Sequence, residues 1–385
     1  MRGSKREKPK GSGVWELRVF LGRDPYSKKQ LAISKTFAGT SKQADSELAK
    51  LVVEAEQGRH KGRNRTVASV FDDWLSHLAA LGRSPTTLVN YESKARTIKG
   101  SPLGALPLSK VTAEQINGFY RDQLRSGKSP TTVHHFHRIL STALKFAEDQ
   151  DWVNWQGRSP VSKSSPPAPD NSEAFEPSVD QVLAVIQAAE ASRQPAMADF
   201  LRLAALTGMR RGEVCGLRWT DVDWDRGLLT VGRSIYQVPG RVGEKTTKNR
   251  RIKRVQLGSG GVHLLARLRE RAEAEAREAR IVLRDDGYIF SGQEDGSTPW
   301  TPNRVTQFMT RLRNRLNIPD FHLHSLRHWS GTALVEAGID VRNVAGRLGH
   351  TDGGSLLLSR YAHRSDEQDR KAGEVLSTHL RLSDT

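Results

Sequence analysis

The part of this chain that most limits what it can fold into and do lies near its carboxy end, between His324 and Tyr361. It opens with the sequence HSLRH, which contains His324 and Arg327, continues to Leu348-Gly349-His350, and reaches Tyr361 eleven residues later. Arginine carries a fixed charge on a planar fork that matches phosphate oxygens, and histidine can move a proton near neutral pH. A tyrosine hydroxyl can form a covalent ester with phosphorus. The ordered set therefore indicates chemistry on a phosphodiester.

A second arginine motif lies upstream, in the sequence TGMRRGE at residues 207–213. The mostly apolar residues 200–206 predict a buried helix that ends at Gly208. Arg210 would then open the next helix, whose backbone N–H groups favour an anion, and Glu213 one turn later can brace Arg210 by ion pairing. Such a pair on its own is common on helix surfaces and weak. Combined with the downstream motif, it predicts a second arginine that binds phosphate.

Together these motifs resemble those of the tyrosine recombinase family, the phage-type integrases, over roughly residues 66–365. The resemblance implies an enzyme that exchanges DNA strands through a 3′-phosphotyrosine bond, without a metal or other cofactor. It also implies that the scissile phosphate is held by Arg210, His324, Arg327 and His350, with Glu213 in support, and that the nucleophile is Tyr361. The loop between His350 and Tyr361 is longer than is usual in the family, which we interpret as a tolerated insertion.

A catalytic lysine is expected on a β-hairpin of the same region. Residues 228–238 are strand-like, a Pro-Gly turn follows, and residues 245–254 are rich in lysine and arginine without one acidic residue. The family resemblance implies a lysine ahead of this basic strand that gives a proton to the leaving oxygen. Lys248 fits best and Lys245 is the alternative, and either could instead only contact the DNA backbone. The candidates for backbone contacts in this stretch are Lys245, Arg250 and Arg251.

The charge of the chain indicates a polyanionic partner. Its formal net charge is +17 and its isoelectric point is about 10.1. A basic protein of a membrane surface is disfavoured, since no apolar run approaches the roughly 18 residues of a spanning helix and no signal peptide is visible. Cys215 is the only cysteine and is expected in the core, and no CxxC or HExxH pattern suggests a metal site. We expect a location on DNA in the cytoplasm of a bacterial host.

Residues 1–65 carry more than half of the net charge, with 16 lysines and arginines against 7 acidic residues. Two strand-like stretches, 13–20 and 32–37, precede a helical pattern over 43–57. This pattern predicts a small sheet packed on one helix, and the family resemblance implies that the domain binds arm-type DNA sites. The alternative is a basic tail that binds DNA without order.

Residues 66–155 are predicted to form a helical domain, which resembles the core-binding domain of integrases. Apolar residues recur at helical spacing, and two helices open with the same sequence, SPTT, at Ser84 and at Ser129. A cation precedes each of them, Arg83 in one case and Lys128 in the other. These helix starts could hold DNA phosphates, or they could simply be good caps.

Proline-rich residues 156–178 predict a flexible linker, and residues 179–385 a catalytic domain with a C-terminal tail. The expected fold is thus mainly α with small β elements (α+β). Three functions remain open: an integrase that joins a mobile element to a chromosome, a type IB topoisomerase-like enzyme, and a non-catalytic DNA-binding relative. The expected partners are duplex DNA attachment sites, further copies of the chain in a homotetramer, and host DNA-bending or excision factors, but no membrane. In the family such a tail docks on a neighbouring protomer, here through Val375, Leu376 and Leu380.

Overall fold

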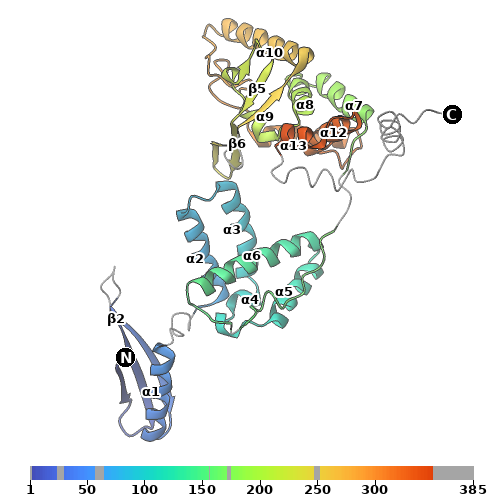
Figure 1. Ribbon diagram of the computed structural model, residues 1–385. Helices are drawn as coiled ribbons and strands as arrows, with labels where there is room; N and C mark the ends of the chain where they lie inside the picture. Colours follow the sequence, from blue (N-terminus) through green and yellow to red (C-terminus); the bar gives the residue numbers. More distant parts are fainter. Residues whose placement is uncertain are drawn as a thin grey trace, which may run out of the picture. The chain divides into compact units, whose positions relative to one another are not determined.

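The computed structural model describes residues 2–23, 30–56, 65–155, 157–170, 175–246 and 252–349 (Figure 1). The chain divides into two compact units, residues 1–172 and residues 173–385. Helices make up most of the described residues, and the strands form small sheets, so the mainly helical α+β fold expected from the sequence is confirmed. None of the helices in the described ranges could span a lipid bilayer.

The first unit begins with a three-stranded antiparallel sheet in the order β1-β2-β3. Its strands are β1 (Arg2–Glu7), β2 (Val14–Arg23) and β3 (Gln30–Ala38), and helix α1 (Ser41–Glu56) packs on it. Alternate residues of β2 face the helix, which buries Leu17 and Val19 against Leu51. The expected sheet and helix are both present. Strand β1 was not predicted, because its sequence RGSKRE has no apolar alternation.

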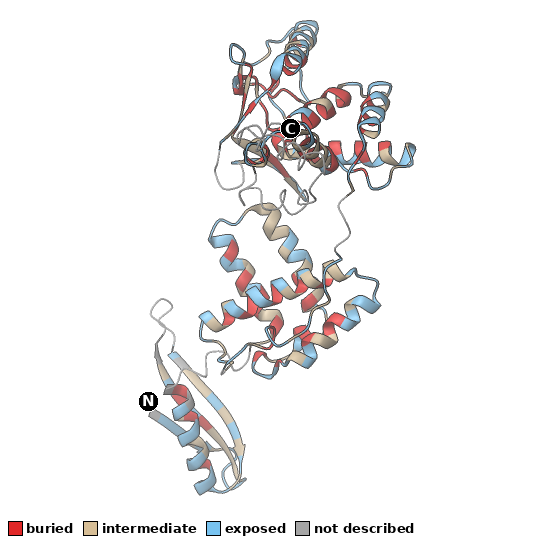
Figure 2. Cartoon of the chain, turned by 45° about the vertical axis from the view of Figure 1, so that its right-hand side comes forward, coloured by how far each residue is buried: buried red, intermediate tan, exposed pale blue. Residues whose placement is uncertain are grey.

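Helices α2 to α6 form the rest of the first unit, around one hydrophobic core. They are α2 (Val67–Ala80), α3 (Pro85–Lys99), α4 (Pro102–Ala105), α5 (Ala113–Arg125) and α6 (Pro130–Asp149), with the short 3-10 turn η1 (Leu108–Lys110) between α4 and α5. Buried residues form a stripe along the long helices, and exposed residues cover the opposite side (Figure 2). The stripe of α6 includes Phe136, Leu140 and Leu144, as helical spacing predicts.

The two SPTT sequences do open helices, but only one serine caps its helix. Ser129 Oγ accepts a hydrogen bond from the Thr132 N–H at 3.2 Å, at the start of α6. Ser84 makes no side-chain cap bond at the start of α3 and pairs with the Thr86 hydroxyl instead. Arg83 and Lys128 are both exposed, so a phosphate could reach either.

The proline-rich segment is irregular, but its first half is anchored on the helical part of the first unit. Val161 belongs to the core of that unit. The Ser165 N–H donates to Asn117 Oδ1 at 2.9 Å, and the Asp170 N–H donates to Thr131 Oγ1 at 3.1 Å. A tether that is free from residue 156 onward, as the prolines suggest, is therefore not what the structure shows over residues 157–170.

The second unit surrounds its own hydrophobic core with helices and two small sheets. Its helices are α7 (Val179–Glu190), α8 (Ala196–Thr207), α9 (Arg211–Cys215), the 3-10 turn η2 (Trp219–Asp221), α10 (Gly258–Glu278), α11 (Pro302–Arg315), α12 (Leu323–Glu336) and α13 (Val341–Leu348). Cys215 is fully buried, and burial raises the pKa of its thiol to about 12, so it is an unreactive core residue as expected.

The strand-like stretch 228–238 is two strands in different sheets. Strand β5 (Leu228–Val231) pairs with β4 (Val222–Asp223) and β8 (Lys253–Gln256), whereas β6 (Arg233–Val238) forms a hairpin with β7 (Arg241–Thr246). Periodicity within the stretch does not reveal the break, because both strands are apolar enough to read as one. The break matters because it separates the hairpin from β8, which approaches the candidate active site.

Candidate active site

The TGMRRGE sequence forms a tight turn between two helices. Helix α8 ends at Gly208, which has the left-handed φ of 60°, and Arg210 is the N-cap of α9. A Cβ at position 208 would lie 2.2 Å from Leu348 Cδ2 of helix α13. Glycine therefore serves both the turn and the close approach of α13, which ends at Leu348 and Gly349 of the LGH sequence.

Arg210 and Glu213 hold each other as the sequence predicts. Glu213 Oε2 accepts the backbone N–H of Arg210 at 3.0 Å, and Oε1 accepts Arg210 Nη1 at 3.0 Å. Glu213 is buried, whereas the Arg210 side chain is 41% exposed. Glu213 therefore holds the guanidinium group while part of that group remains accessible to solvent. Burial alone would raise the pKa of the Glu213 carboxyl, but the charge of Lys253 and the bonds from Arg210 hold that pKa below its usual value.

Arg327 comes from α12 and meets the same turn. Its side chain is buried, and Nη1 donates a hydrogen bond of 2.6 Å to the backbone oxygen of Gly208. Nη2 is also buried and has no hydrogen-bond acceptor among the described residues. Burial and the charge of Arg210 lower the pKa of Arg327 to about 10, which means that a positive charge is held here at a cost. A bound anion would supply both the missing acceptor and the missing countercharge.

His324 lies one helical turn before Arg327 on α12, so the two side chains share a face of that helix. The His324 ring is exposed and lies edge-on to the His328 ring, with 4.5 Å between the ring centroids. Helix α12 is fastened to α8 because the Ser330 hydroxyl donates to the Ala205 carbonyl oxygen. The two motifs that lie more than a hundred residues apart in sequence are thus brought together.

Of the remaining candidates, Lys245 is among the described residues and the others are not. His350, Tyr361, Lys248, Arg250 and Arg251 lie outside the described residues. Lys245, the alternative catalytic lysine, is on β7 with Nζ 5.9 Å from the centroid of the Tyr236 ring. Burial lowers the pKa of Lys245.

Sequence reasoning passed over Lys253, which the structure places beside the two arginines. It lies on β8, its side chain is 10% exposed, and Nζ is 3.6 Å from Glu213 Oε2. Burial lowers its pKa to about 8, helped by the charges of Arg327 and Arg210 and opposed by Glu213. Strand alternation could have found it, since Lys253 shares a face with the buried Val255.

Gly349 is the residue of the LGH sequence that lies close to Lys253. Gly349 ends α13 with a left-handed φ of 72°, and a Cβ there would lie 3.4 Å from Lys253 Cδ. Arg347 fastens α13 by donating to the backbone oxygens of Gln256 and Leu206, both at 2.9 Å. The end of α13 at Gly349 therefore lies next to Lys253, which is 3.6 Å from Glu213 Oε2.

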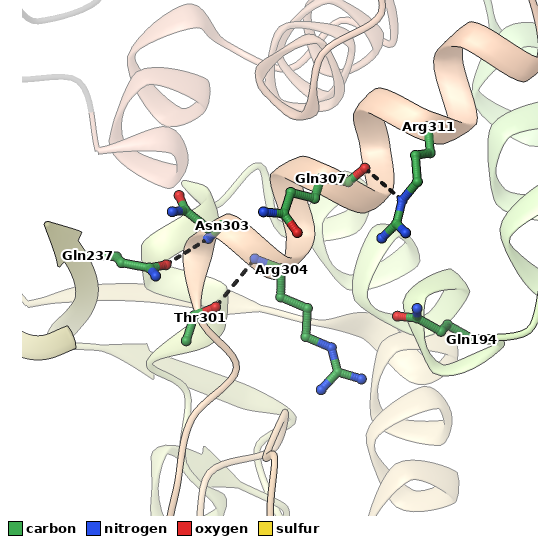
Figure 3. A pocket seen from close by; sticks show the side chains of 7 residues that line it. All are labelled: Gln194, Gln237, Thr301, Asn303, Arg304, Gln307 and Arg311. Carbon is green, nitrogen blue, oxygen red and sulfur yellow. Dashed lines mark hydrogen bonds between the residues drawn. The ribbon is translucent and has the colours of Figure 1, made fainter. Parts of the chain in front are cut away.

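A polar cleft of about 320 Å³ lies along helix α11 (Figure 3). Its lining is made of amide, hydroxyl and guanidinium side chains: Gln194, Gln237, Thr301, Asn303, Arg304, Gln307 and Arg311. The helix is tied to the site because the Arg211 side chain donates to the Thr306 hydroxyl. Among the residues described, no group of His, Cys, Asp or Glu side chains is arranged to hold a metal ion.

Comparison with known proteins identifies the family. The profile of the Phage integrase family matches residues 178–368. A tyrosine recombinase XerC-like protein of Caldanaerobacter subterraneus subsp. tengcongensis is 29% identical over 95% of this chain and 96% of its own length.

Solved structures share the fold. The integrase of the transposon Tn1549, in complex with a circular intermediate DNA, matches 80% of this chain and 99% of its own with a TM-score of 0.69 at 18% identity. A lambda integrase tetramer bound to a Holliday junction matches 89% of this chain and 94% of its own with a TM-score of 0.55 at 21% identity. With the two arginine motifs joined in one site, the profile match over residues 178–368 and the XerC-like relative place this chain in the phage integrase family of tyrosine recombinases.

Proposed function

We propose that this chain integrates a mobile element into DNA, and excises it, by cutting and rejoining strands at specific sites through a 3′-phosphotyrosine intermediate. The observation that supports this most is the pair Arg210 and Arg327. The Arg210 guanidinium is ion-paired with the buried carboxylate of Glu213, whose charge also acts on Arg327, and Arg327 keeps one buried N–H group without an acceptor among the described residues. Such a site is prepared for an anion with oxygens in two directions, as a phosphodiester has.

In the proposed reaction the two arginines bind the non-bridging oxygens of the scissile phosphate. They neutralise the charge that grows there in the transition state, and because Glu213 and Gly208 already hold them, little reorganisation is needed. His324 would donate a hydrogen bond to the same phosphate, and so would His350 of the LGH sequence.

Tyr361 is the proposed nucleophile. Its oxygen attacks phosphorus, the bond from phosphorus to the 5′ oxygen breaks, and a histidine takes the phenol proton. Lys248, or alternatively Lys245, gives a proton to the leaving 5′ oxygen. A 5′ hydroxyl of the partner duplex then attacks the phosphotyrosine and releases Tyr361. The covalent ester conserves the phosphodiester bond energy, so the exchange needs no external energy source.

The DNA sequence would be read in part at the cleft along α11. Amide side chains such as Asn303 and Gln307 suit adenine edges, and arginines such as Arg304 suit guanine edges in a major groove. Arg304 is stacked over the Trp300 ring at 4.3 Å, which restricts its position. Arg83 and Lys128, in the first unit, would contact phosphates without selecting a sequence. The basic sheet-plus-helix part would bind a further, arm-type site.

We also propose that the chain acts as a homotetramer on DNA. The second unit has a largely apolar groove of about 630 Å³, bordered by Val179, Leu183 and Leu206, which are partly exposed. The chain's own tail beyond residue 365 carries apolar residues suited to such a groove: Val375, Leu376 and Leu380. A tail supplied by a neighbouring protomer would link the copies. The lambda integrase that shares this fold is a tetramer on a Holliday junction.

The test uses two DNAs that carry attachment sites, one of them a supercoiled plasmid, with the sites identified from the DNA that the purified protein protects. Recombinant duplexes are the expected product. Relaxation of supercoils without recombinants would show a topoisomerase instead, and protection without any strand cleavage would show a DNA-binding relative.

A further inference from the structure

Lys253 is a buried cation to which the mechanism above gives no task. It projects from β8 toward α9, and its ammonium group is inaccessible to solvent. At 3.6 Å from Glu213 Oε2 it is too far for a good hydrogen bond but close enough for strong charge attraction in a buried site. Burying an ammonium group is costly, and the charges of Arg327 and Arg210 add to that cost, so a role for this lysine is expected.

We propose that Lys253 is a positioning residue for strand cleavage: its ammonium group holds the Glu213 carboxylate that orients Arg210, while its alkyl stem supports the Gly349 turn that leads to His350. This inference rests on the proposed function. Beyond that function, one side chain links the arginine motif of α9 to Gly349 at the end of α13.

The geometry assigns each half of the side chain a contact. Glu213 Oε2 already accepts the Arg210 backbone N–H, so a second positive group near that oxygen fixes the carboxylate in one rotamer. The Cδ atom of Lys253 would lie 3.4 Å from a Cβ at position 349, so the lysine stem packs beside Gly349. A change of this side chain would therefore affect Arg210, through Glu213, and the Gly349 turn together.

The charged neighbours of Lys253 come from each element packed on β8. Helix α9 contributes Glu213 and its cap Arg210, and α12 contributes Arg327. From α13, Arg347 is turned to the backbone oxygens of Gln256 and Leu206. On β5 the paired residue is the uncharged Val231.

A lysine in this setting loses its proton as pH rises through about 8, since burial and the two arginines lower its pKa. Glu213 would then lose one of the charges that hold it. Cleavage should therefore weaken above that pH. A bound phosphate would offset the arginine charges and move the change to higher pH in the DNA complex.

The experiment measures single-turnover formation of the protein–DNA adduct at saturating DNA, from pH 6.5 to 9.5. Lys253→Met should slow cleavage by roughly 30-fold or more at pH 7 and remove the decline above pH 8 that this lysine causes. Lys253→Arg, which keeps the charge, should stay within about threefold at pH 7 and retain its rate at higher pH. Arg254→Met, on the exposed face of the same strand, is the matched control and should cleave like the wild type.

Two further measurements separate positioning from other roles. With a sulfur in place of the leaving 5′ oxygen, no proton donor is needed, so rescue of Lys253→Met by that substrate would show a proton-donating role and overturn the proposal. The effects of Lys253→Met and Glu213→Gln should be far from additive in the double variant, and additive effects would also overturn it.

The behaviour of the wild type shows whether a failure concerns Lys253 or the proposed function. Failure of the wild type to form any adduct would contradict the proposed function itself. An active wild type with an equally active Lys253→Met would contradict only the role of Lys253. If Lys253→Met does not fold, the pH profile of Lys253→Arg decides, because a decline identical to that of the wild type would exclude titration of Lys253.

Discussion

Arg327 donates a hydrogen bond of 2.6 Å from Nη1 to the backbone oxygen of Gly208. This single bond fastens α12, which carries His324, to the turn that precedes Arg210. It also uses only one end of the Arg327 fork and leaves the buried Nη2 without an acceptor among the described residues. The relationship explains why an arginine, and not merely a cation, stands at position 327.

Arg327→Lys should lower the rate of adduct formation by on the order of 100-fold or more, since one ammonium group cannot bond Gly208 and a phosphate oxygen in the same geometry. Single-turnover cleavage measures the loss. Arg277→Lys, at an exposed position of α10, is the control and should leave the rate unchanged. Wild-type cleavage by Arg327→Lys would mean that Arg327 is structural only.

Gly208→Ala should lower the free energy of unfolding by about 2–4 kcal/mol, through its left-handed φ and the clash with Leu348. Gly240→Ala is a matched control, because Gly240 has a φ of 71° with nothing near a Cβ, and it should cost only about 1–2 kcal/mol. Urea unfolding measures both. Equal losses of unfolding free energy in the two variants would show that contact with Leu348 of α13 does not constrain position 208.

Lys253 should make stability depend on pH in a direction opposite to activity. Its folded pKa of about 8 lies below the usual value near 10.5, so between these pH values the unfolded chain binds a proton that the folded chain does not. The stability of the wild type relative to Lys253→Met should therefore rise over this window, by on the order of 3 kcal/mol at most. Unfolding midpoints in urea at several pH values test this, and a constant difference would contradict it.

Gln307→Ala should change which base is preferred at particular positions of the target, because its amide lines the α11 cleft. Lys128→Ala should instead weaken binding to all sequences alike and lower the salt dependence by about one counterion. Binding to a randomised DNA library at two salt concentrations compares them. A uniform loss for Gln307→Ala would place base reading elsewhere.

Removal of residues after 365 should weaken synaptic assembly while leaving binding to a single site intact, since only the former needs a tail from a neighbour. Native gel analysis of one-site and two-site complexes separates the two steps. Undiminished synapsis by the truncated chain would contradict a role of the tail in assembly.

The sequence predicted the parts of the site whose residues recur in ordered motifs. TGMRRGE marks the end of α8, the cap at Arg210 and the brace at Glu213, all of which are local and follow from helix chemistry. Lys253 was not predicted as a site residue because its role depends on which side chains pack against β8. Strand alternation puts Lys253 on the same face as the buried Val255, but only tertiary contacts show that this face meets Glu213 and the two arginines.

The misjudged elements have a similar cause. One apolar stretch became β5 and β6 because pairing partners, β8 and β7, lie in different sheets. Likewise, Val161 draws the proline-rich segment onto the helical core, which its composition does not reveal. Local pattern sets the type of an element, whereas tertiary contacts decide where it packs.

The proposed reaction is tested most directly by trapping the covalent protein–DNA adduct and identifying the linked residue by mass spectrometry of the DNA-bearing peptide. We expect a 3′ phosphate ester on Tyr361, a free 5′ hydroxyl on the cut strand, and no adduct with Tyr361→Phe. An adduct that persists in Tyr361→Phe, or that maps to another residue, would contradict it.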